Sequence, residues 1–327
     1  MRENQKTKIF LGVDGGQSHT EAVIGDEYGN ILGRGLGGAS NHAEIPGGRE
    51  RLENAILDSV GAALKKANLP PIGATIFAAA HCGMTGGADY KREIIGAIIK
   101  SDNLIVGHDA PTALYGATAG TPGIVVISGT GSVVYGENEA GETTQIGGLG
   151  FLFSDEGSGF WLAAQTIRLA IKEQDGLIED SGLQKLVSDF FKVSKILELT
   201  TAFYNEKVSR DEIAALAKIA HEAAENGNQI LQNQIRFGAE ILIESVKSAA
   251  GKLNFPQIFV AAAVGGMFQG ALMKKYFAES LNKNLPDVKL VEPAFGAAIG
   301  ALLIAYHQAN IEINKTLLSN LENTRKK

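Results

Sequence analysis

The sequence contains one cysteine, Cys82, in 327 residues. A single cysteine excludes an intramolecular disulfide framework, a cysteine-based zinc site and an iron–sulfur cluster held by the cysteines of one chain. Basic residues are not in excess either, because 30 lysines and arginines face 36 aspartates and glutamates, a net charge of −6. The sequence therefore lacks the basic surface that nucleic acid requires, and we expect no nucleic-acid partner.

Long hydrophobic runs are also missing. Residues 1–8 are polar and lack the apolar core of a signal peptide. The longest apolar stretches, residues 258–268 and 294–306, are shorter than the roughly 20 residues that span a bilayer. We therefore expect a cytoplasmic protein with no membrane partner.

Glycine, by contrast, is abundant. The 40 glycines are roughly 12% of the sequence, against an average near 7%, whereas prolines number only 8. This composition is neither collagen-like nor of low complexity, so we expect the glycines to serve in individual loops. The length indicates two domains, with enough chain for a substantial core.

The predicted elements fall into two similar halves. The first half opens with strands joined by tight turns, which indicates an antiparallel meander. Apolar residues at helical spacing then predict a helix, and strands alternate with helices from there on. The predicted elements of this half are strands at residues 8–13, 21–24, 31–36, 74–80 and 103–106 and helices at residues 50–67 and 90–100.

The second half repeats this opening. Strands at residues 123–127, 133–136 and 143–146 indicate an internal duplication of one supersecondary unit. A long helical region, residues 158–252, follows. The remaining predicted elements are strands at residues 258–264 and 288–291, a helix between them that ends near residue 284, and a last helix at residues 295–308. The lysine-rich tail is predicted to fray.

Two α/β halves that each open with a glycine-turn hairpin imply a cleft between two domains. Ligands prefer domain interfaces and the carboxyl ends of strands. We therefore expect the chemistry of this protein in that cleft.

The first hairpin turn is Asp14-Gly15-Gly16-Gln17-Ser18. Its glycines expose backbone N–H groups to an anion and its serine adds a hydroxyl donor, so the turn suits phosphate. Asp14 ends an apolar strand and could hold Mg²⁺ through water molecules, because this ion prefers oxygen ligands and keeps much of its hydration. The alternative interpretation is an ordinary Asp-Gly hairpin turn.

The second hairpin turn is Ser128-Gly129-Thr130-Gly131-Ser132. An ordinary turn needs one or two glycines, whereas this run of small residues offers unhindered N–H and O–H donors along its whole length. Two such loops on the two sides of a cleft suit a nucleoside triphosphate.

A carboxylate follows the short apolar strand of residues 103–106. Asp109 should emerge at the carboxyl end of this strand, where it could accept a proton from an attacking hydroxyl group. The alternative is that Asp109 caps a helix that starts near Ala110.

A second carboxylate pair precedes the long helical region, in Asp155-Glu156-Gly157-Ser158. These residues could cap the helix. The preceding Gly147-Gly148-Leu149-Gly150 favours contact with a ligand, because capping alone needs no cluster of glycines.

Together these motifs resemble the N-acetylglucosamine kinase and BadF/BadG/BcrA/BcrD ATPase family, within the superfamily of sugar kinases, Hsp70 and actin. The two hairpin turns resemble its two phosphate loops. Ser40-Asn41-His42 is similar to the segment that binds the amino sugar, and His108-Asp109-Ala110 to the position of the catalytic base. The further matches are Gly147–Gly150 with Asp155–Ser158 for a second sugar segment, Val264-Gly265-Gly266 for the adenosine loop, and Glu292–Ala298 for the closing helix.

The resemblance implies two ribonuclease H-like (actin-like ATPase) α/β domains, each with a βββαβαβα-type mixed sheet, around an interdomain cleft. Residues 1–118 with about 293–327 would form a small N-terminal domain with the first phosphate loop and the catalytic aspartate. Residues 119–292 would form a larger C-terminal domain with the second phosphate loop and the adenosine loop.

The implied activity is an ATP-dependent hexosamine kinase that phosphorylates the 6-hydroxyl of N-acetylglucosamine or a close relative. Glucosamine kinase, N-acetylmuramic acid kinase and a non-kinase ATPase switch of the BadF type are the alternatives. The implied cofactors are ATP and Mg²⁺, the partner is a small amino sugar, and the implied assembly is a homodimer.

The resemblance also implies a role for individual residues. Asp109 would be the catalytic base and Asp14 would orient Mg²⁺ through water. ATP and its phosphates would be bound by Gly15, Gly16, Gln17, Ser18, Gly129, Thr130, Gly131, Gly265 and Gly266. The sugar would be bound by Asn41, His42, Asp109, Gly148, Asp155 and Glu156. Gln17 and Leu149 depart from the glycine and tryptophan that the family often has, so they bear on which sugar is used.

Other classes share parts of this pattern. ATPase activators of radical dehydratases hold a cluster with a pair of cysteines per chain, whereas this chain has only Cys82. A sugar-responsive repressor needs a DNA-binding module, and few residues precede the first predicted strand. A filament-forming actin-like protein would have the two hairpins but no need for Asn41, His42 or the Asp155 segment. A zinc-dependent sugar kinase of the repressor/open-reading-frame/kinase type would need a cysteine cluster.

Overall fold

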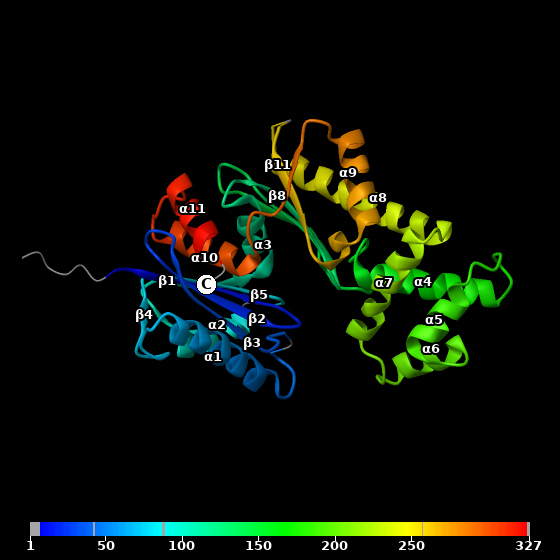
Figure 1. Ribbon diagram of the computed structural model, residues 1–327, viewed down its shortest axis with the longest axis horizontal. Helices are drawn as coiled ribbons and strands as arrows, with labels where there is room; N and C mark the ends of the chain where they lie inside the picture. The colour runs from blue at the N-terminus through cyan, green and yellow to red at the C-terminus, as the bar shows by residue number, and fades with distance from the viewer. Residues whose placement is uncertain (1–6, 42, 87–88, 257, 326–327) are drawn as a thin grey trace, which may run out of the picture. The chain divides into compact units, whose positions relative to one another are not determined.

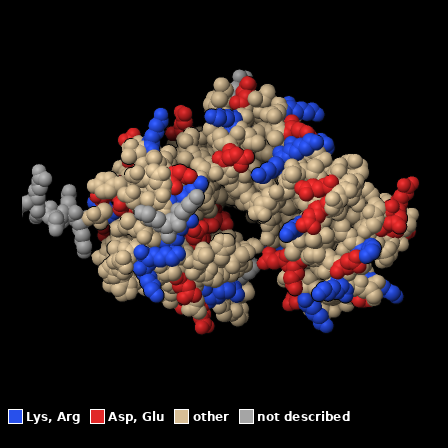
Figure 2. Space-filling model, viewed as in Figure 1, with Lys and Arg blue, Asp and Glu red and all other residues tan. Residues whose placement is uncertain are grey.

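The computed structural model describes residues 7–41, 43–86, 89–256 and 258–325, and Figure 1 shows their course. The chain folds into two units, the first made of residues 1–121 with 292–327 and the second of residues 122–291. On the face shown in Figure 2, both units carry acidic and basic side chains side by side. Among the described residues, no helix combines the length and the apolar character needed to cross a bilayer.

The first unit is built on one mixed sheet. Its strands are β1 (Ile9–Gly15), β2 (Thr20–Asp26), β3 (Ile31–Gly37), β5 (Ala79–Met84) and β7 (Leu104–His108), in the spatial order β3-β2-β1-β5-β7. The first three strands pair antiparallel, as the tight turns predict, and β5 and β7 continue the sheet in parallel with β1. Two short parallel strands, β4 (Ile76–Phe77) and β6 (Lys100–Ser101), form a separate ribbon.

Helices cover both faces of this sheet (Figure 1). They are α1 (Gly48–Lys66), α2 (Asp89–Ile98), α3 (Asp109–Thr118), α10 (Ala297–Gln308) and α11 (Lys315–Thr324). Strand alternation divides the core in two. Leu11 and Val13 of β1 pack in one cluster with Leu52 of α1, whereas Phe10 packs in another with Leu302 and Tyr306 of α10.

Two local predictions in this unit are wrong. The strand expected at residues 74–80 is displaced, because the fully buried strand is β5, which continues through His81 to Met84. The predicted strand ends before His81 because histidine is a polar residue type. In the structure the His81 ring is buried, and its Nδ1 lies 2.9 Å from Nε2 of Gln308. The described part of the tail, which ends at residue 325, is not frayed either, because it forms α11 and buries Leu317 and Leu321.

The second unit repeats the topology of the first. Its strands are β8 (Gly123–Ser128), β9 (Ser132–Glu137), β10 (Thr143–Gly147), β11 (Val260–Val264) and β12 (Lys289–Val291), in the spatial order β10-β9-β8-β11-β12. Again three antiparallel strands are followed by two parallel ones. The predicted duplication of an α/β unit is confirmed.

The predicted helical region of residues 158–252 is a series of separate helices. They are α4 (Gly159–Gln174), α5 (Leu183–Phe191), α6 (Ile196–Tyr204), α7 (Arg210–Glu225) and α8 (Gln229–Lys252). A short 3₁₀ turn, η1 (Gly266–Gln269), and α9 (Ala271–Asn284) follow β11. The core of this unit joins α4, α7 and α8 to the sheet through residues such as Leu162, Leu216 and Ile243.

Candidate functional site

The first hairpin places Asp14 at the end of β1. Asp14 pairs with Glu21 of β2 on one side and with Gly83 of β5 on the other. The turn is closed by a hydrogen bond from the Gly16 N–H to the His19 carbonyl at 3.0 Å. Beyond Asp14 the turn opens to solvent, and Ser18 is exposed. The Asp14 carboxylate therefore lies where the turn begins, and the Ser18 hydroxyl lies at its tip.

Asp109 lies close to Asp14 because Asp14 lies near the end of β1, Asp109 follows the end of β7, and only β5 separates these two strands in the sheet. It is the first residue of α3, directly after β7, and His108 is the N-cap of that helix. The alternative that Asp109 caps α3 is therefore wrong. Desolvation, the nearby charge of Asp109 and that of Glu21 raise the pKa of Asp14 to about 7, while a hydrogen bond from Thr112 works in the opposite direction. These two carboxylates form one electrostatic cluster.

Thr85, which the motif search missed, joins the hairpin to Asp109. It follows β5, and its N–H donates to the Gly15 carbonyl at 2.9 Å. Its Oγ1 donates to Oδ2 of Asp109 at 2.6 Å. No local pattern marks this threonine, because its partners come from β1 and α3.

The segment with Asn41 lies against the same hairpin. The Ser40 N–H donates to the Gly16 carbonyl at 3.2 Å. Nη2 of Arg51, on α1, donates to the Asn41 carbonyl at 2.9 Å. The first unit thus brings together the phosphate-type turn, Asn41 and Asp109, while His42 lies outside the described residues.

The second hairpin turn is held against the start of α4. The N–H groups of Gly159 and Phe160 donate to the carbonyls of Gly129 and Thr130 at 2.8 and 3.2 Å. In the opposite direction, Ser128 Oγ donates to the Gly157 carbonyl at 2.8 Å. These bonds fix the shape of the turn.

The predicted adenosine loop touches the same turn. Gly265 has a φ of +106°, and a Cβ at this position would lie 2.3 Å from the Ser128 carbonyl oxygen. Only glycine fits both the backbone conformation and the space. Gly266 then begins η1. The second unit therefore brings Gly265 and Gly266 beside the phosphate-type turn.

Asp155 lies beside this turn in a strained conformation. Its φ is +65°, which is uncommon for a residue other than glycine, and it is 5% exposed. Ser158, not Asp155, caps α4, by accepting from the Trp161 N–H at 3.2 Å. The segment 155–158 therefore does cap the helix, but through Ser158 and not through the Asp155 carboxylate. The backbone conformation of Asp155 is of a strained kind that clusters at functional sites.

The remaining residues of the second sugar segment are arranged around Asp155. The side chain of Glu156 is exposed, and its carbonyl accepts from Ser132 Oγ at 2.7 Å. Gly148 has a φ of +71° and lies against Val133 of β9. Leu149 is 79% exposed.

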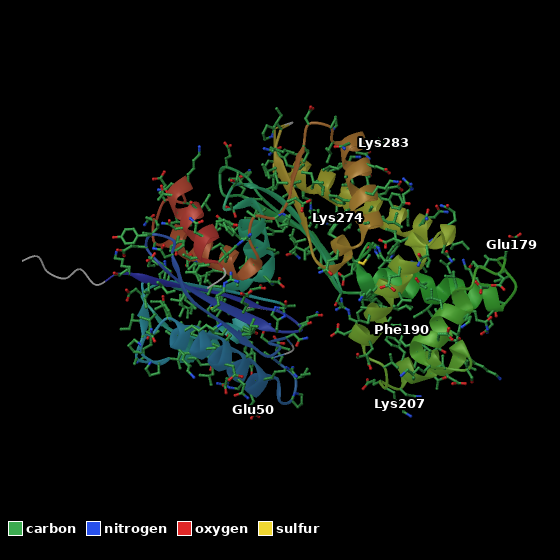
Figure 3. The ribbon with its side chains drawn as sticks, viewed as in Figure 1. Glu50, Glu179, Phe190, Lys207, Lys274 and Lys283 are labelled. Atoms are coloured by element: carbon green, nitrogen blue, oxygen red, sulfur yellow. The ribbon has the colours of Figure 1, made fainter. Side chains whose placement is uncertain are left out.

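Arg210 is a second residue that the motif search missed. Lys207 marks the loop between α6 and α7 in Figure 3, and α7 begins at Arg210 after the capping box of Ser209 and Glu212. Nη2 of Arg210 lies 3.0 Å from Oδ2 of Asp155. Burial raises the pKa of Asp155 and Arg210 offsets part of that rise. The capping box predicts the helix start, whereas the ion pair depends on the tertiary fold.

Arg210→Met is expected to lower the free energy of unfolding by about 2 kcal/mol, because it leaves a buried carboxylate without its cation. Urea unfolding of the single variant and of the double variant with Asp155→Asn measures this, and the second substitution should recover most of the loss. Arg236→Met is the matched control, since its ion pair with Glu279 is about half exposed (48% and 49%). Equal losses in Arg210→Met and Arg236→Met would contradict the prediction.

The carboxylates of Asp14 and Asp109 are the groups of this site that suit a metal ion. Among residues 7–41, 43–86, 89–256 and 258–325, no three His, Cys, Asp or Glu side chains are grouped so that they could hold a metal ion. The pair Asp14 and Asp109 offers oxygen ligands with mutual repulsion, which a hydrated divalent cation would relieve. The residues present therefore fit a hydrated Mg²⁺.

The duplicated α/β unit, with a glycine-rich hairpin turn in each copy, defines an actin-like ATPase. Residues 11–305 match the model of the BadF/BadG/BcrA/BcrD ATPase family, and the chain belongs to this family. It is 30% identical over 311 residues to the N-acetylmuramic acid/N-acetylglucosamine kinase of Clostridium acetobutylicum, covering 91% of this chain and 98% of that protein. It is 24% identical over 316 residues to the N-acetyl-D-glucosamine kinase of Dictyostelium discoideum, covering 91% and 98%.

Solved structures agree with this assignment of the fold. A candidate N-acetylglucosamine kinase from Chromobacterium violaceum superposes with a TM-score of 0.74 at 27% identity, covering 91% of this chain and 99% of that one. A ROK family glucokinase from Streptomyces griseus, solved with glucose and AMPPNP, has a TM-score of 0.55 at 17% identity, covering 91% and 99%. The second likeness concerns the fold alone.

Proposed function

We propose that this protein is an ATP-dependent hexosamine kinase that phosphorylates the 6-hydroxyl of N-acetylglucosamine or a close relative such as N-acetylmuramic acid. The observation that carries the proposal is Asp109, a carboxylate that accepts a hydrogen bond from Thr85 at the carboxyl end of β7, near Asp14 at the glycine-rich turn of β1 and β2. The names of the similar proteins, which are kinases of these amino sugars, support the substrate class.

In the proposed reaction, the sugar 6-hydroxyl oxygen bonds to the γ-phosphorus of ATP. The bond from that phosphorus to the bridging oxygen breaks, ADP leaves with the electron pair, and the hydroxyl proton passes to Asp109. In phosphoryl transfer the protein mainly positions the two reactants and stabilises the charge on the phosphoryl group. The hydroxyl groups of Ser18 and Thr130 and the N–H groups of Thr130 and Gly131 would donate to phosphate oxygens. Gly129 would contribute by letting the phosphate approach closely, because its own N–H donates to the Gly131 carbonyl at 2.9 Å.

We assign the two units different parts of this reaction. The first unit would carry the base and the first phosphate turn, with Gly15, Gly16, Gln17 and Ser18. The second would carry Gly129–Gly131 for phosphate and Gly265 with Gly266 for the adenosine. The sugar would be bound by Asn41, Gly148, Asp155 and Glu156.

Mg²⁺ would be held by Asp14 through water, and when bound it would neutralise charge on the phosphates. The high pKa of Asp14, about 7, means that this carboxyl is partly protonated near neutral pH without a cation. A cytoplasmic location and a homodimer remain predictions.

The proposal is tested by ADP release from the purified protein with ATP and Mg²⁺. The panel of acceptors is N-acetylglucosamine, N-acetylmuramic acid, glucosamine and glucose, each with product analysis by mass spectrometry and NMR. Release that depends on an amino sugar and yields a 6-phosphate supports the kinase and identifies its substrate. Release that is independent of every sugar would indicate an ATPase switch instead, and no release at all would refute the proposal for these acceptors.

A further inference from the structure

The first unit buries a lysine beside the proposed base. Lys91, on α2, is 1% exposed and is among the largest fully buried side chains of the described residues. Lysine is seldom fully buried, because its ammonium group loses hydration, so its position calls for a specific partner. The Nζ of Lys91 donates a hydrogen bond to the Thr85 carbonyl.

Two carboxylates, those of Glu44 and Asp109, act electrostatically on this ammonium group. Burial lowers the pKa of Lys91, while the charges of Glu44 and Asp109 act in the opposite direction. The neighbouring Arg92 is directed elsewhere, because its Nη2 donates to the Val106 carbonyl at 3.4 Å.

Thr85 connects Lys91 to the base. Its carbonyl accepts from Lys91, its N–H donates to the Gly15 carbonyl and its hydroxyl donates to Asp109 Oδ2 at 2.6 Å. All three polar groups of this one residue are therefore in use, toward α2, the first hairpin and α3. A residue held at three points presents its hydroxyl in one direction.

We propose that Lys91 and Thr85 are positioning residues, which hold the Asp109 carboxylate so that Oδ1 is the oxygen directed at the acceptor hydroxyl. The Thr85 hydroxyl occupies Oδ2 and thereby sets the rotation of the carboxylate. Lys91 anchors the Thr85 backbone and supplies a positive charge within a cluster of carboxylates. The inference rests on the proposed function, because it assigns the geometry of the base in that reaction.

Thr85→Val and Lys91→Met test the inference through kcat and KM measured separately. Loss of the hydroxyl or of the ammonium group should lower kcat on the order of 10–100-fold, because a misplaced base loses reactive geometry. The KM values for ATP and sugar should stay within about threefold, since the phosphate and sugar contacts remain. Thr85→Ser keeps the hydroxyl and should retain kcat within about threefold.

Matched controls separate this effect from a loss of stability. Thr166→Val removes a buried hydroxyl that bonds the Leu162 carbonyl of its own helix, at 2.8 Å. Lys65→Met removes an exposed lysine at the end of α1. Both controls should leave kcat unchanged. Unchanged kcat in Thr85→Val, or a change confined to KM, would overturn the inference.

A crystal structure of Thr85→Val provides a readout that does not depend on activity. The inference expects the Asp109 carboxylate to rotate or to adopt several orientations in the variant. A carboxylate that stays in place would refute the positioning role even if the wild-type protein proves inactive on every sugar. Inactivity of the wild type, by contrast, refutes the proposed kinase and not the contact.

Discussion

Asp109→Asn is expected to retain ATP binding and to lose sugar phosphorylation by at least about a hundredfold. The amide has the size of the carboxylate, and its oxygen can still accept the hydrogen bond from Thr85, so the local structure should persist. The amide cannot take up the proton of the sugar hydroxyl. Turnover with saturating ATP and sugar measures the loss, and calorimetric titration with a non-hydrolysable ATP analogue measures the retained binding.

Asp58→Asn is the control for this prediction, because Asp58 lies on the exposed face of α1 in the same unit. It should keep full activity. An Asp109→Asn protein with near wild-type turnover would show that Asp109 is not the base, and would also remove the basis of the role assigned to Thr85 and Lys91.

Gly300→Ala is expected to lower the free energy of unfolding by about 3 kcal/mol. Helix α10 crosses α3 at this glycine, where an added Cβ would lie 1.9 Å from the Thr112 carbonyl oxygen and 2.5 Å from the Gly116 nitrogen. Both contacts are with backbone, so the two helices must separate. Urea unfolding measures the change, and activity should also fall because α3 begins with Asp109.

Gly61→Ala is the matched control, since a Cβ at this position in α1 would meet nothing within 4 Å. Alanine is favoured over glycine inside a helix by up to about 1 kcal/mol, so this variant should be slightly more stable than the wild type. Similar losses in Gly300→Ala and Gly61→Ala would mean that the close approach of α3 and α10 is not what limits the size of residue 300.

Local patterns in the sequence determined the topology of both units. Tight glycine turns between apolar strands predicted the antiparallel meander, and their recurrence predicted the second unit, because turn chemistry and strand alternation act between neighbouring residues. The same turns, together with Asp109 after an apolar strand, identified segments that the structure assembles within each unit.

Tertiary structure decided what depends on residues distant in sequence. Strand β5 runs through a buried histidine, and α11 is held because Leu317 and Leu321 pack in one cluster with Ile31 of β3 and Tyr306 of α10. Arg210 meets Asp155 across 55 positions, and Asp109 meets Thr85 across 24. No pattern in the neighbouring sequence of Arg210 or Thr85 indicates these partners. The burial and the hydrogen bonds of a side chain are determined only when distant segments have packed together.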